Sequence, residues 1–151
     1  MSQGDDAGAA SGAHYAMLTS RFNEPVTRRL AAGARAALLE AGVAEAAIHE
    51  YWVDGAWELV SVTAAVLETG RFRAVIACGA VIRGETAHFD HICRAVTDGL
   101  GALQRQQRTP IGFAVLTTDT AEQAYTRADT KGGEAVHAAL EAADVIESLR
   151  G

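Results

Sequence analysis

The stretch that most constrains the fold is residues 75–90, where an apolar run gives way to a helical pattern. Residues 75–82 are rich in β-branched side chains, which is typical of a strand buried on both faces. After Arg83 and Gly84, apolar residues recur at helical spacing: Phe89, Ile92, Cys93, Val96, Leu100 and Leu103. The chain therefore passes from the carboxyl end of a strand, through a short polar loop, into a helix amino terminus. Open α/β sheets bind ligands at such junctions, and free backbone N–H groups favour an anion there.

Three residues of this polar loop carry useful chemistry. Gly84 provides a glycine backbone without a side chain, Thr86 provides a hydroxyl, and His88 provides an imidazole that can transfer protons near neutral pH. The loop is therefore suited to hold a phosphate beside a proton-transfer group.

The remaining chain repeats the strand–helix order. Strands are predicted at residues 15–19, 48–53 and 110–118, in addition to the one at 75–82. Asn23 is expected as the N-cap of the first helix, with Pro25 in its first turn, and Gly42 and Gly70 should end the first two helices. A long helix should end near Gln107, and Asp119 with Glu122 should cap a short helix. A last helix should follow residues 131–133. This order predicts one mostly parallel sheet with helices on both faces, spanning residues 14–151 as a single domain after a flexible tail at 1–13.

Composition excludes several classes of function. The 151 residues carry a net charge of −6 without a basic run, which argues against nucleic-acid binding. No apolar stretch is long enough to span a membrane, and the polar start lacks the pattern of a signal peptide, so we expect a cytoplasmic protein. The two cysteines, Cys78 and Cys93, are expected to be small buried apolar residues.

Two motifs come close to known sites without matching them. Residues 79–86 have the spacing of a P-loop, but Glu85 stands where the phosphate-binding lysine belongs, so an NTPase is a poor reading. His88 and His91 are too sparse a ligand set to predict a metal.

Polar and aromatic residues also follow the other predicted strands, and those strand ends share one edge of the sheet. Each residue has a plainer alternative. Phe22 could be a hydrophobic staple, Trp57 a core residue, and Glu58 a charge that compensates the helix dipole.

The motifs together resemble the lumazine synthase family, whose members catalyse the penultimate step of riboflavin biosynthesis. The resemblance covers nearly the whole chain after the tail. It rests on SRFN at 20–23, GAWEL at 55–59, GAVIRGETAHFD at 79–90, FAVLTTDT at 113–120, EQA at 122–124, RA at 127–128 and KGGEA at 131–135.

The resemblance implies a three-layer α/β/α, flavodoxin-like fold with a four-stranded parallel sheet. It also implies condensation of 5-amino-6-(D-ribitylamino)uracil with 3,4-dihydroxy-2-butanone 4-phosphate to 6,7-dimethyl-8-ribityllumazine, without a metal or organic cofactor. The family forms pentamers, and a short loop between the last two helices, as here, accompanies closed icosahedral shells of sixty subunits.

The resemblance assigns roles to particular residues. His88 would transfer protons, and Glu85 and Thr86 would bind the phosphate through backbone N–H groups. Phe22 would stack on the heterocycle, and the backbone of Ala80, Val81 and Ile82 would form hydrogen bonds with it. The substrate pocket would also contain Asn23, Ala56, Trp57, Glu58 and Lys131. Phe113 and Arg127 would come from the neighbouring subunit, and that Arg127 would clamp the phosphate.

The chain departs from the family pattern at three places. Asp54 and Val60 stand where prolines are usual, and the loop before Lys131 is about four residues shorter, which makes Lys131 the least secure assignment. These departures motivate one alternative to the synthase, a non-catalytic cage protein that binds flavin or lumazine. A second alternative is a riboflavin synthase of archaeal type, an enzyme of similar fold.

Overall fold

The core of the protein is one fully parallel four-stranded sheet in the order β2-β1-β3-β4. The computed structural model describes residues 12–151, so the predicted flexible tail lies outside the described residues except for Gly12 and Ala13. The strands are β1 (His14–Ser20), β2 (Ile48–Val53), β3 (Phe72–Ile82) and β4 (Ile111–Thr118). All four predicted strands are therefore present, within three residues at each boundary.

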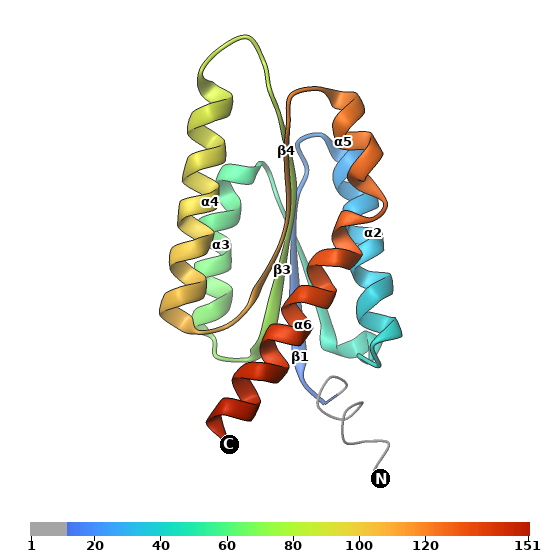
Figure 1. The fold of residues 1–151 in the computed structure, drawn as a ribbon, viewed down its shortest axis with the longest axis vertical. Helices are drawn as coiled ribbons and strands as arrows, with labels where there is room; N and C mark the ends of the chain where they lie inside the picture. Colours follow the sequence, from blue (N-terminus) through green and yellow to red (C-terminus); the bar gives the residue numbers. More distant parts are fainter. Residues whose placement is uncertain (1–11) are drawn as a thin grey trace.

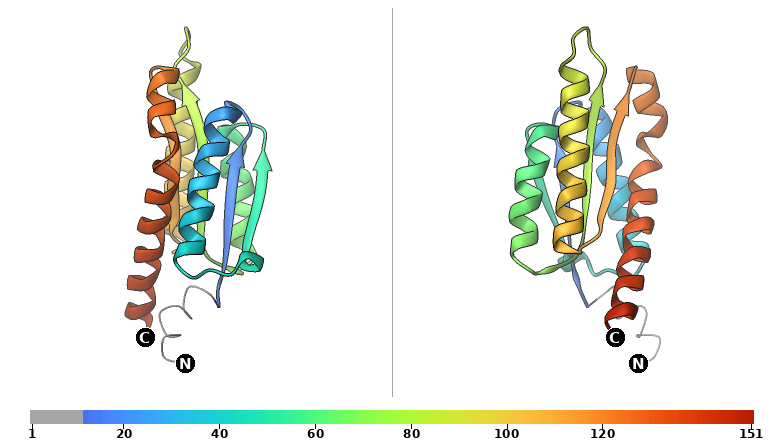
Figure 2. Two further views of the ribbon diagram at one scale, coloured as in Figure 1. Left: turned by 90° about the vertical axis from the view of Figure 1, so that its right-hand side faces the viewer. Right: turned by 60° about the vertical axis from the view of Figure 1, so that its left-hand side comes forward.

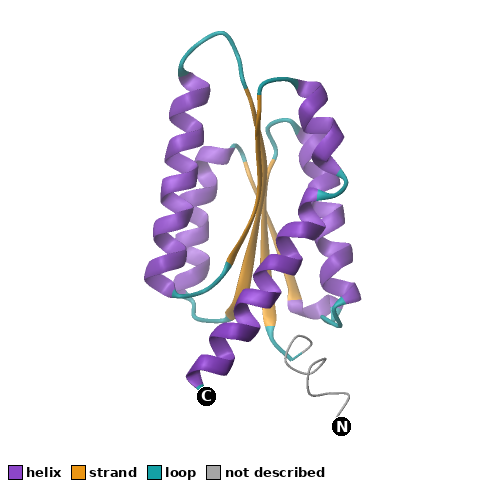
Figure 3. Ribbon diagram, in the orientation of Figure 1, coloured by secondary structure: helices purple, strands orange, loops and turns teal. Residues whose placement is uncertain are grey.

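Helices cover both faces of this sheet, which Figures 1 and 3 show nearly edge-on between two helical layers. One layer contains α2 (Glu24–Glu40), α5 (Ala121–Ala128) and α6 (Lys131–Arg150), and the other contains α3 (Ala56–Glu68) and α4 (His88–Gln107); a short 3₁₀ turn, η1 (Glu45–Ala47), precedes β2. Figure 2 shows the strands running side by side in one direction. The predicted three-layer α/β/α architecture is confirmed.

The alternation of side chains along β3 explains the two cores. Ile76 and Cys78 face the α2 and α6 layer, whereas Val75 and Ala77 face α3 and α4, and all four are fully buried. A central parallel strand covered on both faces reads as a continuous apolar run, which is the pattern that predicted it.

Two helix boundaries differ from the prediction. Helix α5 is capped by Thr120, whose Oγ1 accepts a hydrogen bond from Gln123 N (3.1 Å), one residue later than the predicted Asp119–Glu122 pair. Helix α6 begins at Lys131 and includes Gly132 and Gly133, which were predicted to precede it. By contrast, the predicted stops after α2 and α3 are confirmed, since Gly42 and Gly70 take left-handed φ angles of 96° and 68°.

A close approach of backbones explains why α6 tolerates glycine in its first turn. A Cβ atom on Gly132 would lie 2.1 Å from Leu30 O of α2, whereas one on Gly133 would meet only ordinary contacts, the nearest at 3.7 Å from Gly33 O. The first and last helices therefore pack almost backbone to backbone at Gly132.

The two glycines should respond oppositely to alanine. We expect Gly132→Ala to lower the free energy of unfolding by about 2 kcal/mol, because a backbone clash forces the helices apart. Gly133→Ala, the matched control, should leave it unchanged or raise it by up to about 0.5 kcal/mol, because alanine favours helix. Urea unfolding at one protein concentration measures both, and equal effects would contradict the packing argument.

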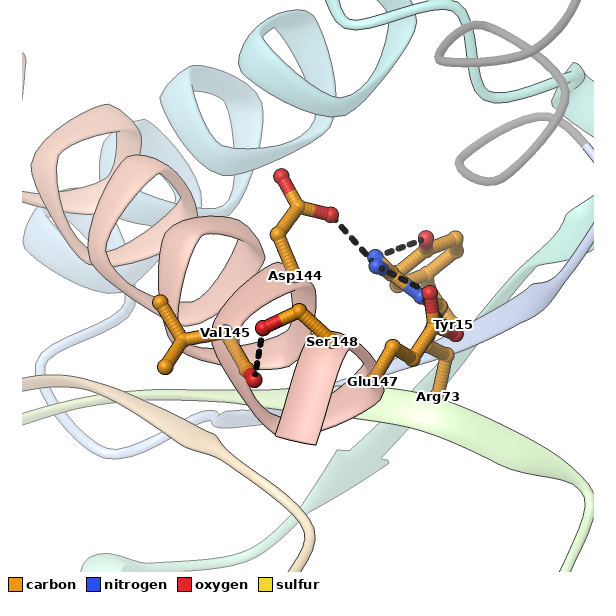
Figure 4. Close-up of polar contacts among 6 residues, drawn as sticks. All are labelled: Tyr15, Arg73, Asp144, Val145, Glu147 and Ser148. Carbon is orange, nitrogen blue, oxygen red and sulfur yellow. Dashed lines mark hydrogen bonds and ion pairs between the residues drawn. The ribbon is translucent and has the colours of Figure 1, made fainter. Parts of the chain in front are cut away.

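Arg73 ties the carboxyl-terminal part of α6 to the sheet, as Figure 4 shows. Its side chain is only 8% exposed, and it donates to Glu147 Oε2 (2.9 Å), Asp144 Oδ1 (2.5 Å) and the buried Tyr15 Oη (3.1 Å). The Arg73 hydrogen bond holds the pKa of Glu147 below its usual value. A largely buried guanidinium is stable here because four oxygens, including both of the Glu147 carboxylate, satisfy its donors.

Replacing Arg73 by methionine should lower the free energy of unfolding by about 1 to 3 kcal/mol, because it leaves the Tyr15 hydroxyl buried without a partner. The double variant Arg73→Met/Tyr15→Phe should recover part of that loss. The Glu147 carboxylate has a lower pKa when folded, so its contribution is complete above its unfolded pKa and lost as the pH falls through the folded value. The difference between wild type and Arg73→Met, followed by urea unfolding, should therefore shrink on acidification.

Candidate functional site

A cavity of about 710 Å³ opens at the carboxyl edge of the sheet, beside the ends of β1, β2 and β3. Volumes of this order are typical of sites for small molecules. Its walls are mainly apolar, with a hydroxyl, a carboxylate and an imidazole among them. The lining residues are Phe22, Gly55, Ala56, Trp57, Glu58, Ala80, Val81, Ile82, Gly84, Thr86, His88, Phe89 and Ile92.

Two aromatic side chains stand at this cavity without being buried. Phe22 is 71% exposed and Trp57 is 60% exposed, so the staple interpretation of Phe22 and the core interpretation of Trp57 are wrong. Backbone contacts hold their two loops together, because Phe22 N donates to Asp54 O (2.9 Å). Exposed aromatic faces beside an apolar cavity offer stacking surfaces for a flat ligand.

Asn23 supports the cavity without lining it. The residue precedes α2 with a left-handed φ of 66° and makes no side-chain cap, contrary to its predicted capping role. Its Nδ2 instead donates to Ala80 O (2.9 Å), which ties the β1–α2 loop to the end of β3. The backbone of Ala80 that faces the cavity is therefore fixed from behind.

Glu58 has a structural contact as well as a place in the cavity wall. Its Oε1 accepts a hydrogen bond from Gly55 N (2.9 Å), which satisfies a free donor at the start of α3. The interpretation of Glu58 as a helix-terminus charge is thus confirmed. The same contact orients the carboxylate at the cavity.

The loop between β3 and α4 rises above the rest of the sheet edge in Figure 1. Residues 83–88 are all exposed, and His88 is the first residue of α4. Thr86 Oγ1 accepts a hydrogen bond from His88 N at 3.3 Å. Thr86 and His88 both line the cavity, whereas Glu85 does not. A polar group and an imidazole at a helix amino terminus thus face an apolar pocket.

Three predicted site residues lie away from the cavity of their own chain. Phe113 and Lys131 line a separate hollow of about 440 Å³ between β4 and α6, and Lys131 Nζ lies 3.7 Å from Glu134 Oε1. Arg127 Nη1 donates to Gln123 O (2.9 Å) at the end of α5. The structure therefore brings nine of the predicted residues together in one cavity and leaves Asn23, Glu85, Phe113, Arg127 and Lys131 outside it.

Sequence reasoning missed several contributors to this site. Phe89 and Ile92 line the cavity, although they were counted only as the buried face of a helix. Arg83 bridges Asp119 and Asp90 beside the same loop. No motif chemistry marked Arg83, because its partners lie seven and thirty-six residues away.

The departures from the family pattern lie outside the cavity wall. Asp54 contributes its backbone carbonyl to the two loops, but it is absent from the lining residues. Val60 packs on α4, since a Cβ atom on Gly99 would lie 2.8 Å from Val60 Cγ1. Neither residue is part of the pocket wall.

Within residues 12–151, the cysteines form no disulfide, and no cluster of metal-binding side chains is present. Both cysteines are free thiols; Cys78 is buried, as predicted, and Cys93 is partly buried. Burial raises the pKa of the Cys78 thiol to about 12, so it is protonated at neutral pH. The described residues contain no group of three or more His, Cys, Asp or Glu side chains that could hold a metal ion.

The fold and the cavity define a class of protein: a parallel α/β protein with an apolar cavity at the carboxyl edge of its sheet, flanked by exposed aromatic side chains and a polar helix-terminus loop. A sequence model of the family described as 6,7-dimethyl-8-ribityllumazine synthase matches residues 12–147. The chain belongs to this family, so the resemblance drawn from its motifs is confirmed.

A named relative gives the same result. The chain is 43% identical over 143 residues to the 6,7-dimethyl-8-ribityllumazine synthase of Lactiplantibacillus plantarum (strain ATCC BAA-793 / NCIMB 8826 / WCFS1). The match covers 92% of this chain and 90% of that protein. In the described part of the chain, no helix is long and apolar enough to cross a membrane.

Proposed function

We propose that the protein condenses 5-amino-6-(D-ribitylamino)uracil with 3,4-dihydroxy-2-butanone 4-phosphate to give 6,7-dimethyl-8-ribityllumazine, phosphate and water. The observation that carries the proposal is the 710 Å³ cavity, which combines two exposed aromatic faces, a polar helix-terminus loop and one imidazole. Family membership over residues 12–147 supports the same reaction. The protein is an enzyme, a transferase of riboflavin biosynthesis.

The cavity wall divides naturally between the two substrates. Phe22 and Trp57 would stack on the pyrimidine, and the backbone of Ala80, Val81 and Ile82 would bond its polar edge. The Glu58 carboxylate, with Oε1 held by Gly55 N, retains Oε2 to accept a ribityl hydroxyl, and Ala56 would pack beside it.

The phosphate substrate would bind on the exposed loop. Backbone N–H groups of Glu85 and Thr86 lie just before the amino terminus of α4, where the helix dipole favours an anion. His88 would then move protons during imine formation, phosphate elimination and ring closure, each of which needs a proton transferred near neutral pH. Holding both substrates together supplies most of the remaining acceleration.

We also propose that the site is completed by a neighbouring subunit in a homo-pentamer. Phe113 and Lys131 lie in a hollow at β4, which is an edge strand, and five residues of this hollow are glycine or alanine. A second chain docked there would bring Phe113 and Arg127 to the open side of the next cavity, where Arg127 would clamp the phosphate. The two-residue connection from α5 to α6 favours a shell of sixty subunits.

A cytoplasmic location fits the rest of the proposal. Cys78 and Cys93 are free thiols, as expected in a reducing compartment. No metal or organic cofactor enters the proposed reaction.

One paired assay tests the proposed function. The purified protein is mixed with both substrates, and lumazine formation is followed by absorbance; a second sample receives lumazine alone and is examined for riboflavin. We expect lumazine in the first sample and no riboflavin in the second. Riboflavin from lumazine alone would indicate the archaeal-type synthase, and lumazine binding without turnover in either sample would indicate a cage protein.

A further inference from the structure

We propose that Arg83 is a positioning residue that holds the loop of residues 84–87 in the shape that binds the substrate phosphate. The inference rests on the proposed function, because it concerns the phosphate side of the same site. It assigns Arg83 and its partner Asp119 a role that neither the motifs nor the cavity lining gave them.

The loop needs such support because it makes few contacts of its own. Every residue from 83 to 88 is exposed. Within the loop itself, the side-chain hydrogen bond that the structure provides is the one from His88 N to Thr86 Oγ1, at 3.3 Å. Exposed segments with few buried contacts open readily, and a loop that must be ordered on binding weakens affinity.

The Arg83 side chain connects the two ends of this loop, the end of β3 and the first turn of α4. Arg83 follows β3, whereas Phe89 and Asp90 lie in the first turn of α4. Its Nη1 lies 3.4 Å from Asp90 Oδ1, and its guanidinium lies 4.4 Å from the centre of the Phe89 ring. Phe89 is buried and lines the cavity, so the contact connects the loop to the pocket wall.

A second anchor connects Arg83 to the neighbouring strand. Arg83 Nε donates to Asp119 Oδ1 at 2.8 Å, and Arg83 N donates to Thr118 O at 2.9 Å. Asp119 is itself held, because Asp119 N donates to Gln123 Oε1 at 2.8 Å. The loop is therefore fastened to the start of α5.

The same connection reaches the residue that would serve the next subunit. Gln123 lies in the first turn of α5, and its backbone carbonyl accepts a hydrogen bond from Arg127 Nη1 (2.9 Å). Arg83, Asp119, Gln123 and Arg127 thus form one continuous set of polar contacts. Arg83 fixes the phosphate loop of its own cavity against the helix that carries the clamp.

Direct binding of phosphate by Arg83 is the competing role, and the geometry disfavours it. Two carboxylates, Asp90 and Asp119, already accept from the guanidinium and offset its charge. Arg83 is also absent from the residues that line the cavity. A guanidinium paired in this way acts on its neighbours more than on a ligand.

The test compares Arg83→Gln and Asp119→Asn with the control Arg94→Gln, an exposed arginine on the outer side of α4. Arg83→Gln should raise the KM for the butanone phosphate about 5-fold to 30-fold, and Asp119→Asn about 2-fold to 5-fold, with a much smaller change in kcat. The KM for the pyrimidine and the thermal midpoint should stay unchanged. Arg94→Gln should behave as wild type.

Asp119→Asn separates the two roles. If Arg83 bound phosphate directly, removing a competing carboxylate would leave the KM unchanged or lower it, and that result would overturn the proposal. The double variant should resemble Arg83→Gln alone, because Asp119 acts through Arg83. Additive losses would equally contradict it.

A readout independent of turnover keeps this inference apart from the proposed function. Hydrogen–deuterium exchange of a peptide covering residues 84–92 should be faster in Arg83→Gln and Asp119→Asn than in wild type, and unchanged in Arg94→Gln. Unchanged exchange in all three variants would reject the positioning role. A wild-type protein that forms no lumazine but shows the exchange difference would reject only the proposed reaction.

Discussion

Replacing His88 by alanine is expected to lower kcat for lumazine formation by about 10-fold to 10³-fold, without abolishing it. The imidazole is the one side chain of the cavity wall that transfers protons readily near neutral pH, and it lies at the start of α4 beside Thr86. Residual activity should persist because the aromatic faces and the loop still hold the two substrates together. Steady-state absorbance kinetics with both substrates saturating measures the effect.

The matched control is His91→Ala. His91 is exposed on the same helix one turn later and does not line the cavity, so its replacement should leave kcat within about 2-fold of wild type. Wild-type turnover by His88→Ala would show that another group transfers the protons. Equal losses in both variants would point to a general effect on α4.

Replacing Arg127 by alanine is expected to raise the KM for the butanone phosphate about 10-fold to 10²-fold, because a charge-assisted bond to the phosphate is lost. The KM for the pyrimidine should change little. Arg105→Ala provides a control on an exposed arginine of α4. An unchanged KM in Arg127→Ala would refute the clamp.

Mixed assemblies test whether Arg127 acts in the neighbouring cavity. His88→Ala and Arg127→Ala chains, co-expressed in equal amounts, should regain about a quarter of the wild-type sites, because a site between randomly mixed chains takes each residue from a different one. The assay uses a low concentration of butanone phosphate, at which each variant alone has little activity. Activity no higher than the mean of the two parents would show that both residues serve the same chain.

Much of the fold was predictable because local and long-range signals agree. The apolar run before Arg83 predicted a doubly covered strand, and β3 is buried on both faces. Where two capping patterns overlap with an offset of one residue, the sequence did not show which of them is used. Asp119 with Glu122 and Thr120 with Gln123 both have the spacing of a capping pair, and only the structure selects the second.

Long-range packing decided the features that sequence reasoning missed. Two glycines normally end or precede a helix, yet Gly132 lies inside α6 because Leu30 O approaches it too closely for a side chain. Asn23 has the composition of a cap, but its amide bonds Ala80 O across 57 residues. The exposure of Phe22 and Trp57 was equally invisible, since a pattern of residues does not distinguish a wall from a core.

The contact between α2 and α6 also limits the order in which the chain can fold. Residues 30 and 132 are far apart in sequence, so the inner surface of α2 stays partly uncovered until residues 131–150 have left the ribosome. Until then, the surface of α2 that contacts Gly132 is open to solvent or to chaperones. Completion of this half of the core is therefore a late step in the folding of the chain.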